Sequence, residues 1–151
     1  MTTARLLFLA ALAAGLLAVF LAVRPHRAPV LPRTAGVASA AVTQANIRAT
    51  ICRAGWTKTI RPPVAYTNAL KLKQMRQYGE RGAPSAYQED HLISLELGGD
   101  PTDPRNLWPE PYPRAASMDQ IENELNHAVC AGKLSLQAAQ AEESKIKHTR
   151  G

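Results

Sequence analysis

The sequence predicts a small α+β domain behind an N-terminal hydrophobic segment, and three observations support this fold class. Residues 87–97 are rich in β-prone side chains and end at a Gly-Gly pair, after which 106–108 form a short returning strand. Stretches with helical apolar spacing lie on both sides of this hairpin. Residues 6–23 are an apolar run without a single charge.

The apolar run predicts export or membrane insertion, because it is long enough to cross a bilayer and is apolar on every face. We expect a signal peptide or a transmembrane anchor over residues 1–24. Ala38-Ser39-Ala40 fits a cleavage site, whereas its distance from the run favours an uncleaved anchor that contacts the membrane through residues 6–23. The expected location is the periplasm or the inner membrane, with secretion if the signal is cleaved.

The remaining chain divides into a Pro/Ala-rich linker over 25–42 and a domain over 43–151, whose core we place at 87–131. Ile47 and Ile51 predict a short helix within 43–52, and β-prone residues predict an extended segment over 55–63. A helix is expected from Thr67, as its N-cap, to Tyr78, with Gly79 as its stop.

Two further helices are expected after the hairpin. Ser117 is the predicted N-cap of the first, which runs to about Ala131 and stops at Gly132. Its predicted inner stripe consists of Ile121, Leu125, Ala128 and Val129. The second runs from Leu136 to about Lys147, with Ser135 as its cap.

Two cysteines, Cys52 and Cys130, lie near the two ends of the predicted domain. In an exported protein such a pair indicates a disulfide, whereas in a cytosolic protein it indicates two buried thiols. A bridge that closes so long a loop stabilises a domain by about 4 kcal/mol on the chain-entropy model. The sequence has no cysteine and histidine spacing typical of structural zinc.

Charge is unevenly distributed along the domain. Residues 41–81 hold eight lysines and arginines against Glu80 alone, whereas 82–131 hold nine acids against Arg105 and Arg114. A basic half suits a polyanion such as nucleic acid and an acidic half suits a divalent cation, although two solvated surfaces give the same pattern. The candidate phosphate-binding residues are Lys58, Arg61, Lys71, Lys73 and Arg76.

The adjacent pair Asp90-His91 has the chemistry that phosphodiester hydrolysis needs. Histidine accepts a proton near neutral pH, and a carboxylate is a hard oxygen ligand that suits Mg²⁺. Neighbouring side chains on a strand point to opposite faces, so the two residues can act separately on water and on a cation. Asn106 returns on the second strand, where its amide oxygen can accept a hydrogen bond from an imidazole N–H.

The order of these motifs resembles the core of HNH nucleases of the ββα-metal superfamily. Asp90-His91, Gly98-Gly99 and Asn106-Leu107 are followed by an amphipathic helix, and the resemblance covers residues 87 to about 125. It implies a ββα-metal nuclease core, a β-hairpin plus a helix, with flanking helices.

The resemblance also implies roles. His91 would be the general base, Asp90 a ligand of Mg²⁺ or another divalent ion such as Mn²⁺, and Asn106 the residue that orients the base. Such nucleases usually carry another metal ligand early on the helix, where this chain has neither His nor Asn. Asp119 and Glu122, three residues apart on one helical face, are the substitutes we expect. A Cys52–Cys130 bridge would replace the zinc-binding cysteines of some relatives.

These expectations combine into a metal-dependent endonuclease that hydrolyses DNA, and RNA as a further substrate, with little sequence specificity. No small-molecule cofactor is implied. The alternative is a catalytically inactive HNH-fold protein that binds nucleic acid or serves as an envelope scaffold, which the missing helix ligand favours. A third possibility is a periplasmic adaptor whose charged halves bind protein partners.

Overall fold

The computed structural model describes residues 30–149 and has mixed α+β architecture. The expected signal or anchor over 1–24 and the first part of the expected linker lie outside the described residues. The elements are η1 (Ile47–Ala49), α2 (Trp56–Ile60), α3 (Val64–Tyr78), η2 (Pro84–Ala86), β1 (Tyr87–His91), η3 (Leu95–Leu97), β2 (Leu107–Pro111), α4 (Tyr112–Cys130) and α5 (Leu136–Thr149).

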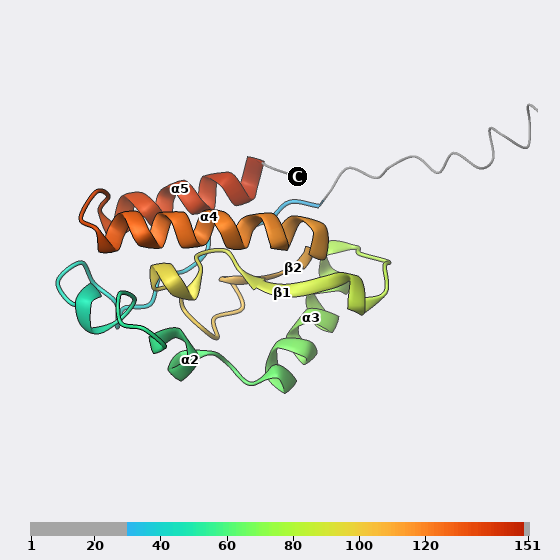
Figure 1. The fold of residues 1–151 in the computed structure, drawn as a ribbon. Coiled ribbons are helices and arrows are strands. Elements are labelled where there is room, and N and C mark those ends of the chain that lie inside the picture. Colours follow the sequence, from blue (N-terminus) through green and yellow to red (C-terminus); the bar gives the residue numbers. More distant parts are fainter. Residues whose placement is uncertain (1–29, 150–151) are drawn as a thin grey trace, which may run out of the picture.

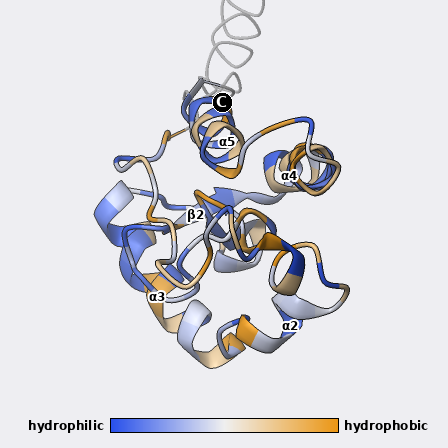
Figure 2. Ribbon diagram, turned by 90° about the vertical axis from the view of Figure 1, so that its left-hand side faces the viewer, coloured by the Kyte–Doolittle hydropathy of each residue, from blue (hydrophilic) through white to orange (hydrophobic). Residues whose placement is uncertain are grey.

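A two-stranded antiparallel sheet, β1 with β2, lies at the centre of the described chain. In Figure 1 the hairpin runs between α3 below and α4 above, and both helices contact both strands. Helix α5 packs on α4 and also reaches η3. Figure 2 views α4 and α5 nearly end-on and shows hydrophilic and hydrophobic residues around each helix, as expected for helices that are only half covered.

The register of the hairpin explains how β2 tolerates two prolines. Asp90 pairs with Trp108 and His91 with Leu107, and the next pair is joined by a bond from the Leu92 N–H to the carbonyl of Asn106. Hydrogen-bonded pairs alternate along an antiparallel ladder. Pro109 and Pro111 therefore occupy positions whose backbone nitrogen points away from β1, where no donor is needed.

The first strand is shorter than predicted, because β1 ends at His91 rather than at residue 97. The side chain of Asn106 takes over the bonds that a partner strand would make to Ile93, accepting from its N–H and donating to its carbonyl, both at 3.0 Å. The chain then turns into η3, with Gly98 at a φ of 73°. At Gly99 an added Cβ would lie 1.8 Å from the Ile93 carbonyl oxygen, so only glycine fits the predicted Gly-Gly turn.

The predicted ends of the helices are confirmed, but two of the predicted starts are wrong. Gly79 and Gly132 have φ values of 73° and 72° just beyond α3 and α4, as expected for glycine stops. Helix α3 begins at Val64, directly after Pro63, and α4 begins at Tyr112, directly after Pro111. A proline just before or within the first turn costs no helical hydrogen bond, so both helices start earlier than the polar caps suggest. Ser135 caps α5 as predicted, since its Oγ accepts from the Ala138 N–H at 3.2 Å.

Two smaller expectations in the N-terminal half also change. Residues 56–60 form the short helix α2 rather than an extended segment, because Gly55 turns the chain with a φ of 77° and Trp56 packs against the core. The expected helix within 43–52 is reduced to the 3-10 turn η1, in which Ile47 is buried, and Ile51 is buried just after it.

The segment that we expected to be a free linker, residues 25–42, is packed against the domain over its described part. The Val37 N–H donates to Asn106 Oδ1 at 3.0 Å, and the Val37 carbonyl accepts from the Asp100 N–H at 2.8 Å. Ala38 forms a β-bridge with Gly99, and Val42 is buried in the core. The folded unit therefore begins before residue 43.

A hydrophobic cluster joins the N-terminal turns to the C-terminal end of α4 and the N-terminal end of α5. Its buried members are Val42, Ile47, Ile51, Ile93, Leu97, Val129, Leu136 and Ala139. Next to it, Cys52 and Cys130 form a disulfide that links residues 78 apart in sequence, which confirms the expected bridge. The disulfide is compatible with an exported protein. Within residues 30–149 no helix is long and apolar enough to cross a membrane.

Candidate functional site

A polar pocket of about 320 Å³ lies where β1, the loop after it and α4 meet. Its lining residues are Arg61, Gln88, Asp90, His91, Ser94, Leu95, Glu96, Asp119, Glu122 and Asn123. The fold thus brings the predicted base and all three predicted metal ligands into one pocket, together with one of the five predicted phosphate-binding residues.

His91 lies at the end of β1 and is 7% exposed. Its Nε2 is 3.2 Å from the carbonyl oxygen of Pro101. A carbonyl can only accept, so Nε2 carries the ring proton and Nδ1 keeps a free lone pair. Burial lowers the pKa of His91, although the Pro101 carbonyl and Asp90 act in the opposite direction. The imidazole is therefore neutral near pH 7 and able to accept a proton.

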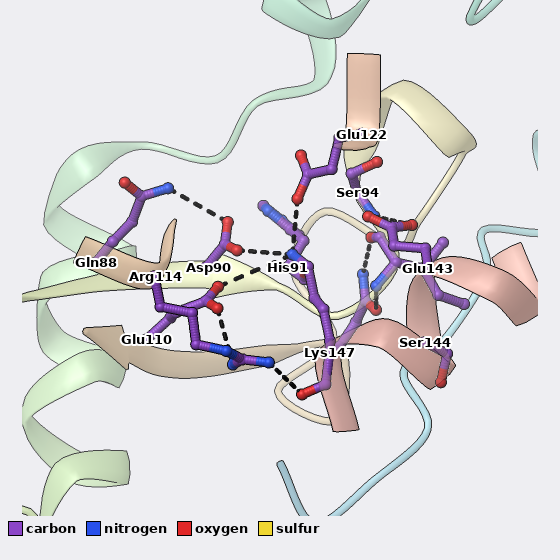
Figure 3. Close-up of polar contacts among 12 residues, drawn as sticks. Gln88, Asp90, His91, Ser94, Glu110, Arg114, Glu122, Glu143, Ser144 and Lys147 are labelled. Carbon is purple, nitrogen blue, oxygen red and sulfur yellow. Dashed lines mark hydrogen bonds and ion pairs between the residues drawn. The ribbon is translucent and has the colours of Figure 1, made fainter. Parts of the chain in front are cut away.

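An unexpected cation lies beneath the pocket. Helix α5 brings the ammonium group of Lys147, which is fully buried, to within 2.7 Å of both Asp90 Oδ2 and Glu122 Oε1. The same group donates to the backbone carbonyl of His91 at 2.5 Å. Figure 3 shows the lysine side chain reaching from α5 to these partners.

This ammonium group favours the ionised form of its two carboxyl partners, against the effect of burial. Burial alone would raise the pKa of Asp90, but Lys147 and a hydrogen bond from Glu110 hold it well below its usual range. For Glu122, burial outweighs the attraction of Lys147 and raises the pKa to about 7. Burial would lower the pKa of Lys147, but the surrounding carboxylates raise it above its usual value. Lys147 is thus charged near pH 7.

Two more buried carboxyl groups, Glu110 and Glu143, and the half-buried Arg114 surround the lysine. Glu110 pairs with Arg114 at 2.8 Å, and burial together with the nearby Asp90 raises the pKa of Glu110 to about 9. Arg114 also donates to the backbone carbonyl of Lys147. Glu143 accepts from the Ser94 N–H with both oxygens at 3.0 Å, and burial raises its pKa to about 8 against the pull of Lys147.

Asn106 does not orient the base by accepting from the imidazole, as we expected. Its side chain is fully buried, and its amide makes hydrogen bonds to backbone groups instead of to His91. Besides its bonds to Val37 and Ile93, its Nδ2 donates to the Asp100 carbonyl at 2.9 Å. The next residue, Pro101, provides the carbonyl that faces His91. Asn106 therefore contacts the loop that contains Pro101, and the Pro101 carbonyl contacts His91. Its effect on the base is indirect, whereas we expected a direct hydrogen bond.

The predicted phosphate-binding residues do not form one cluster, since Arg61 lies at the polar pocket and Lys71, Lys73 and Arg76 lie on α3. Arg61 lines the polar pocket. Lys71 donates to the Tyr87 carbonyl at 3.0 Å, which gives it a structural role. Lys73 and Arg76 are exposed on α3, and Lys73 lines a second hollow of about 500 Å³ that also contains Arg33 and Arg105. Lys58 is exposed on α2.

The carboxylates do not fit a resident divalent ion in this arrangement. Asp90 and Glu122 each commit one oxygen to Lys147, and a dication between them would lie beside a buried ammonium charge. Among residues 30–149, no group of three or more His, Cys, Asp or Glu side chains is placed to hold a metal ion.

The sequence reasoning assigned no role to Glu110, Arg114, Glu143 or Lys147. One pattern points to the last two, because the buried side chains of α5 are Leu136, Ala139, Glu143 and Lys147, at helical spacing along one face. A charged pair that continues an apolar stripe indicates buried partners on another element. The predicted inner stripe of α4 is correct in part, because Val129 is buried and Leu125 packs against the core. The other buried residues of α4 are Ala115, Met118 and Glu122, so Glu122 points inward.

The chain matches no protein-family model, and no curated protein or solved structure shows significant similarity to it. The fold and the site therefore define only a class: a disulfide-linked α+β protein in which a hairpin histidine lines a polar pocket above a buried ionic cluster.

Proposed function

We propose that the protein is a nuclease of the ββα-metal type that hydrolyses phosphodiester bonds of DNA, and of RNA as a further substrate, with little sequence specificity. One observation carries the proposal. The hairpin places His91 in a polar pocket with its Nε2 tied to a backbone carbonyl, so that the other ring nitrogen is a free base. The order of hairpin and helix, β1, β2 and α4, supports the same class.

The reaction follows from the chemistry of these groups. Nδ1 of His91 takes a proton from a water molecule as the water oxygen attacks phosphorus. The Arg61 guanidinium, which lines the same pocket, pairs with the phosphoryl oxygens and offsets the negative charge that develops there. The bond from phosphorus to the departing sugar oxygen breaks, and that oxygen takes a proton from solvent.

A second function is favoured by one specific observation. Lys147 neutralises the carboxylates from which a metal-dependent nuclease would bind its ion. A protein with this feature can keep the architecture and bind nucleic acid without cutting it. Binding without cleavage, by folded protein and under every metal condition, would support this inactive alternative.

The test is cleavage of supercoiled plasmid and of single-stranded RNA by the full-length chain, purified oxidised in detergent. Each reaction is run with Mg²⁺, with Mn²⁺ and with EDTA. Loss of a general base costs about 10²-fold or more in rate, so His91→Ala should lose that much activity. His127→Ala, an exposed histidine on α4 outside the pocket, is the matched control and should keep the wild-type rate. Intact substrates under all conditions would contradict the proposal.

A further inference from the structure

The ammonium group of Lys147 lies between the carboxylates of Asp90 and Glu122, and both of these residues line the pocket that contains His91. All three of its N–H donors are used, by Asp90 Oδ2, Glu122 Oε1 and the His91 carbonyl. Its side chain is fully buried, so the group cannot contact a substrate in the pocket. Lys147 is therefore a positioning residue, which acts through the groups it holds (Figure 3).

The three oxygens around this nitrogen form a typical donor set for a hard cation, two carboxylates and one backbone carbonyl. They come from two separate parts of the sequence: adjacent residues at the end of β1, Asp90 and His91, and Glu122 on α4. The two carboxylate contacts of 2.7 Å are those of charge-assisted hydrogen bonds and exceed the 2.0–2.1 Å at which Mg²⁺ binds oxygen. With Lys147 in place, these carboxylates are therefore spaced for an ammonium group rather than for Mg²⁺.

We propose that Lys147 is the resident cation of this site and that α5 supplies from within the chain the positive charge that ββα-metal nucleases take from a divalent ion. The native protein then binds no divalent ion between Asp90 and Glu122, and its pocket is organised without metal. The comparison with those nucleases rests on the proposed function, but the binding of ions by this site can be measured whether or not the protein cleaves nucleic acid.

The complete burial of the Lys147 ammonium group indicates that it has a specific role. A buried ion pair is seldom more stable than apolar residues of the same volume, so stability alone does not account for a charged lysine at this depth. The lysine holds the carbonyl of His91 as well as the carboxylate next to it in sequence. It thereby fixes the end of β1 at the residue that faces the pocket.

The first test is metal binding by the wild-type full-length chain. We expect no change in Tm with 1 mM EDTA or with 1 mM MnCl₂, and no paramagnetic broadening of the His91 ring signals by stoichiometric Mn²⁺. Broadening of these signals, or a rise in Tm with Mn²⁺ that Glu122→Gln abolishes, would overturn the proposal. This test does not depend on any variant of Lys147 being folded.

The second test removes the cation. Lys147→Ala leaves two buried carboxylates uncompensated, so its Tm should fall by roughly 10 °C. The emptied position then has the ligands of a divalent-ion site, and 1 mM MnCl₂ should restore about 5 °C or more of that loss. Lys145→Ala, an exposed lysine on the same helix, should show neither effect.

A double variant separates the two causes. Lys147→Ala with Glu122→Gln removes one negative charge together with the positive one, so it should recover part of the Tm without any response to Mn²⁺. A folded Lys147→Ala chain that Mn²⁺ does not stabilise would contradict the proposal. Absence of cleavage in the plasmid assay, combined with the expected binding results, would remove the proposed nuclease function and leave Lys147 as the resident cation.

Discussion

His91 and Asp90 are neighbours on one strand, yet their surroundings set opposite charge states. The imidazole is kept neutral because burial lowers its pKa, and the carboxyl is kept ionised because Lys147 lies 2.7 Å away. A base that is neutral and an acid that is charged at the same pH form a useful catalytic combination. The difference depends on one lysine that is 57 residues away from Asp90 along the chain.

Glu89 offers a test of burial at the level of a single residue. Neither oxygen of its carboxyl has a hydrogen-bond partner within the described part of the chain. Burial raises its pKa from an ordinary 4.5 to about 8, with Lys71 opposing and Asp90 assisting. The native state therefore holds a proton that the unfolded state releases above about pH 4.5. The stability that Glu89 contributes is present below that pH and is lost as the pH rises through about 8.

Glu89→Gln, which mimics the protonated form, should raise Tm at pH 9 by about 5 °C and leave it nearly unchanged at pH 5. The measurement is thermal unfolding of both proteins at pH 5, 7 and 9. Other buried acids titrate equally in both chains, so the difference between the two profiles isolates Glu89. Glu124→Gln, exposed on α4, is the control. Parallel profiles for wild type and Glu89→Gln would show that this carboxyl is solvated.

At the scale of elements, the sequence predicts features that depend on local backbone geometry, such as helix ends. It does not predict features that depend on side chains distant in sequence, such as the length of β1. Glycine stops predict the ends of α3 and α4 because only local backbone geometry is involved. The length of β1 is not predictable in this way, since the Asn106 side chain replaces the partner strand at Ile93. Similarly, Asp90, His91 and Glu122 are found from local motifs, whereas Lys147 joins them only through the packing of α5.

The contribution of Asn106 to the free energy of unfolding can be tested through its bonds to the loop between the strands. Four backbone groups bond to its amide: the N–H groups of Val37 and Ile93, and the carbonyls of Ile93 and Asp100. Each buried polar group that loses its partner costs about 1–3 kcal/mol, so Asn106→Ala should lower the free energy of unfolding by about 4 kcal/mol. Urea denaturation at 25 °C measures the change.

Asn68→Ala, an exposed asparagine on α3, is the control for this substitution and should shift the free energy of unfolding by no more than about 0.5 kcal/mol. A loss below about 1 kcal/mol in Asn106→Ala would mean that water or other groups replace the amide. In that case the loop and its Pro101 carbonyl would not depend on Asn106.

At the scale of the whole molecule, the sheet separates two kinds of surface. On one side, α3 presents exposed Lys73 and Arg76, and the hollow beside it adds Arg33 and Arg105. On the other side, α4 and α5 enclose the acidic groups and Lys147. The charge asymmetry of the sequence is thus realised in space, since a basic helix flanks the hairpin opposite the ionic cluster (Figure 1).

This arrangement predicts how binding to nucleic acid depends on salt. Each phosphate contact made by a lysine or arginine releases counterions, and the slope of log K against log salt changes by about 0.9 per contact on duplex DNA. If Lys73 and Arg76 bind phosphates, the double variant Lys73→Ala/Arg76→Ala should bind a 20-base-pair duplex more weakly, with a slope smaller by about 1.8.

Fluorescence anisotropy in EDTA between about 50 and 200 mM KCl measures the slope. Lys145→Ala, an exposed lysine on α5, should leave it unchanged. An unchanged slope in the double variant would move the phosphate-binding surface away from α3, to the pocket side where Arg61 lies.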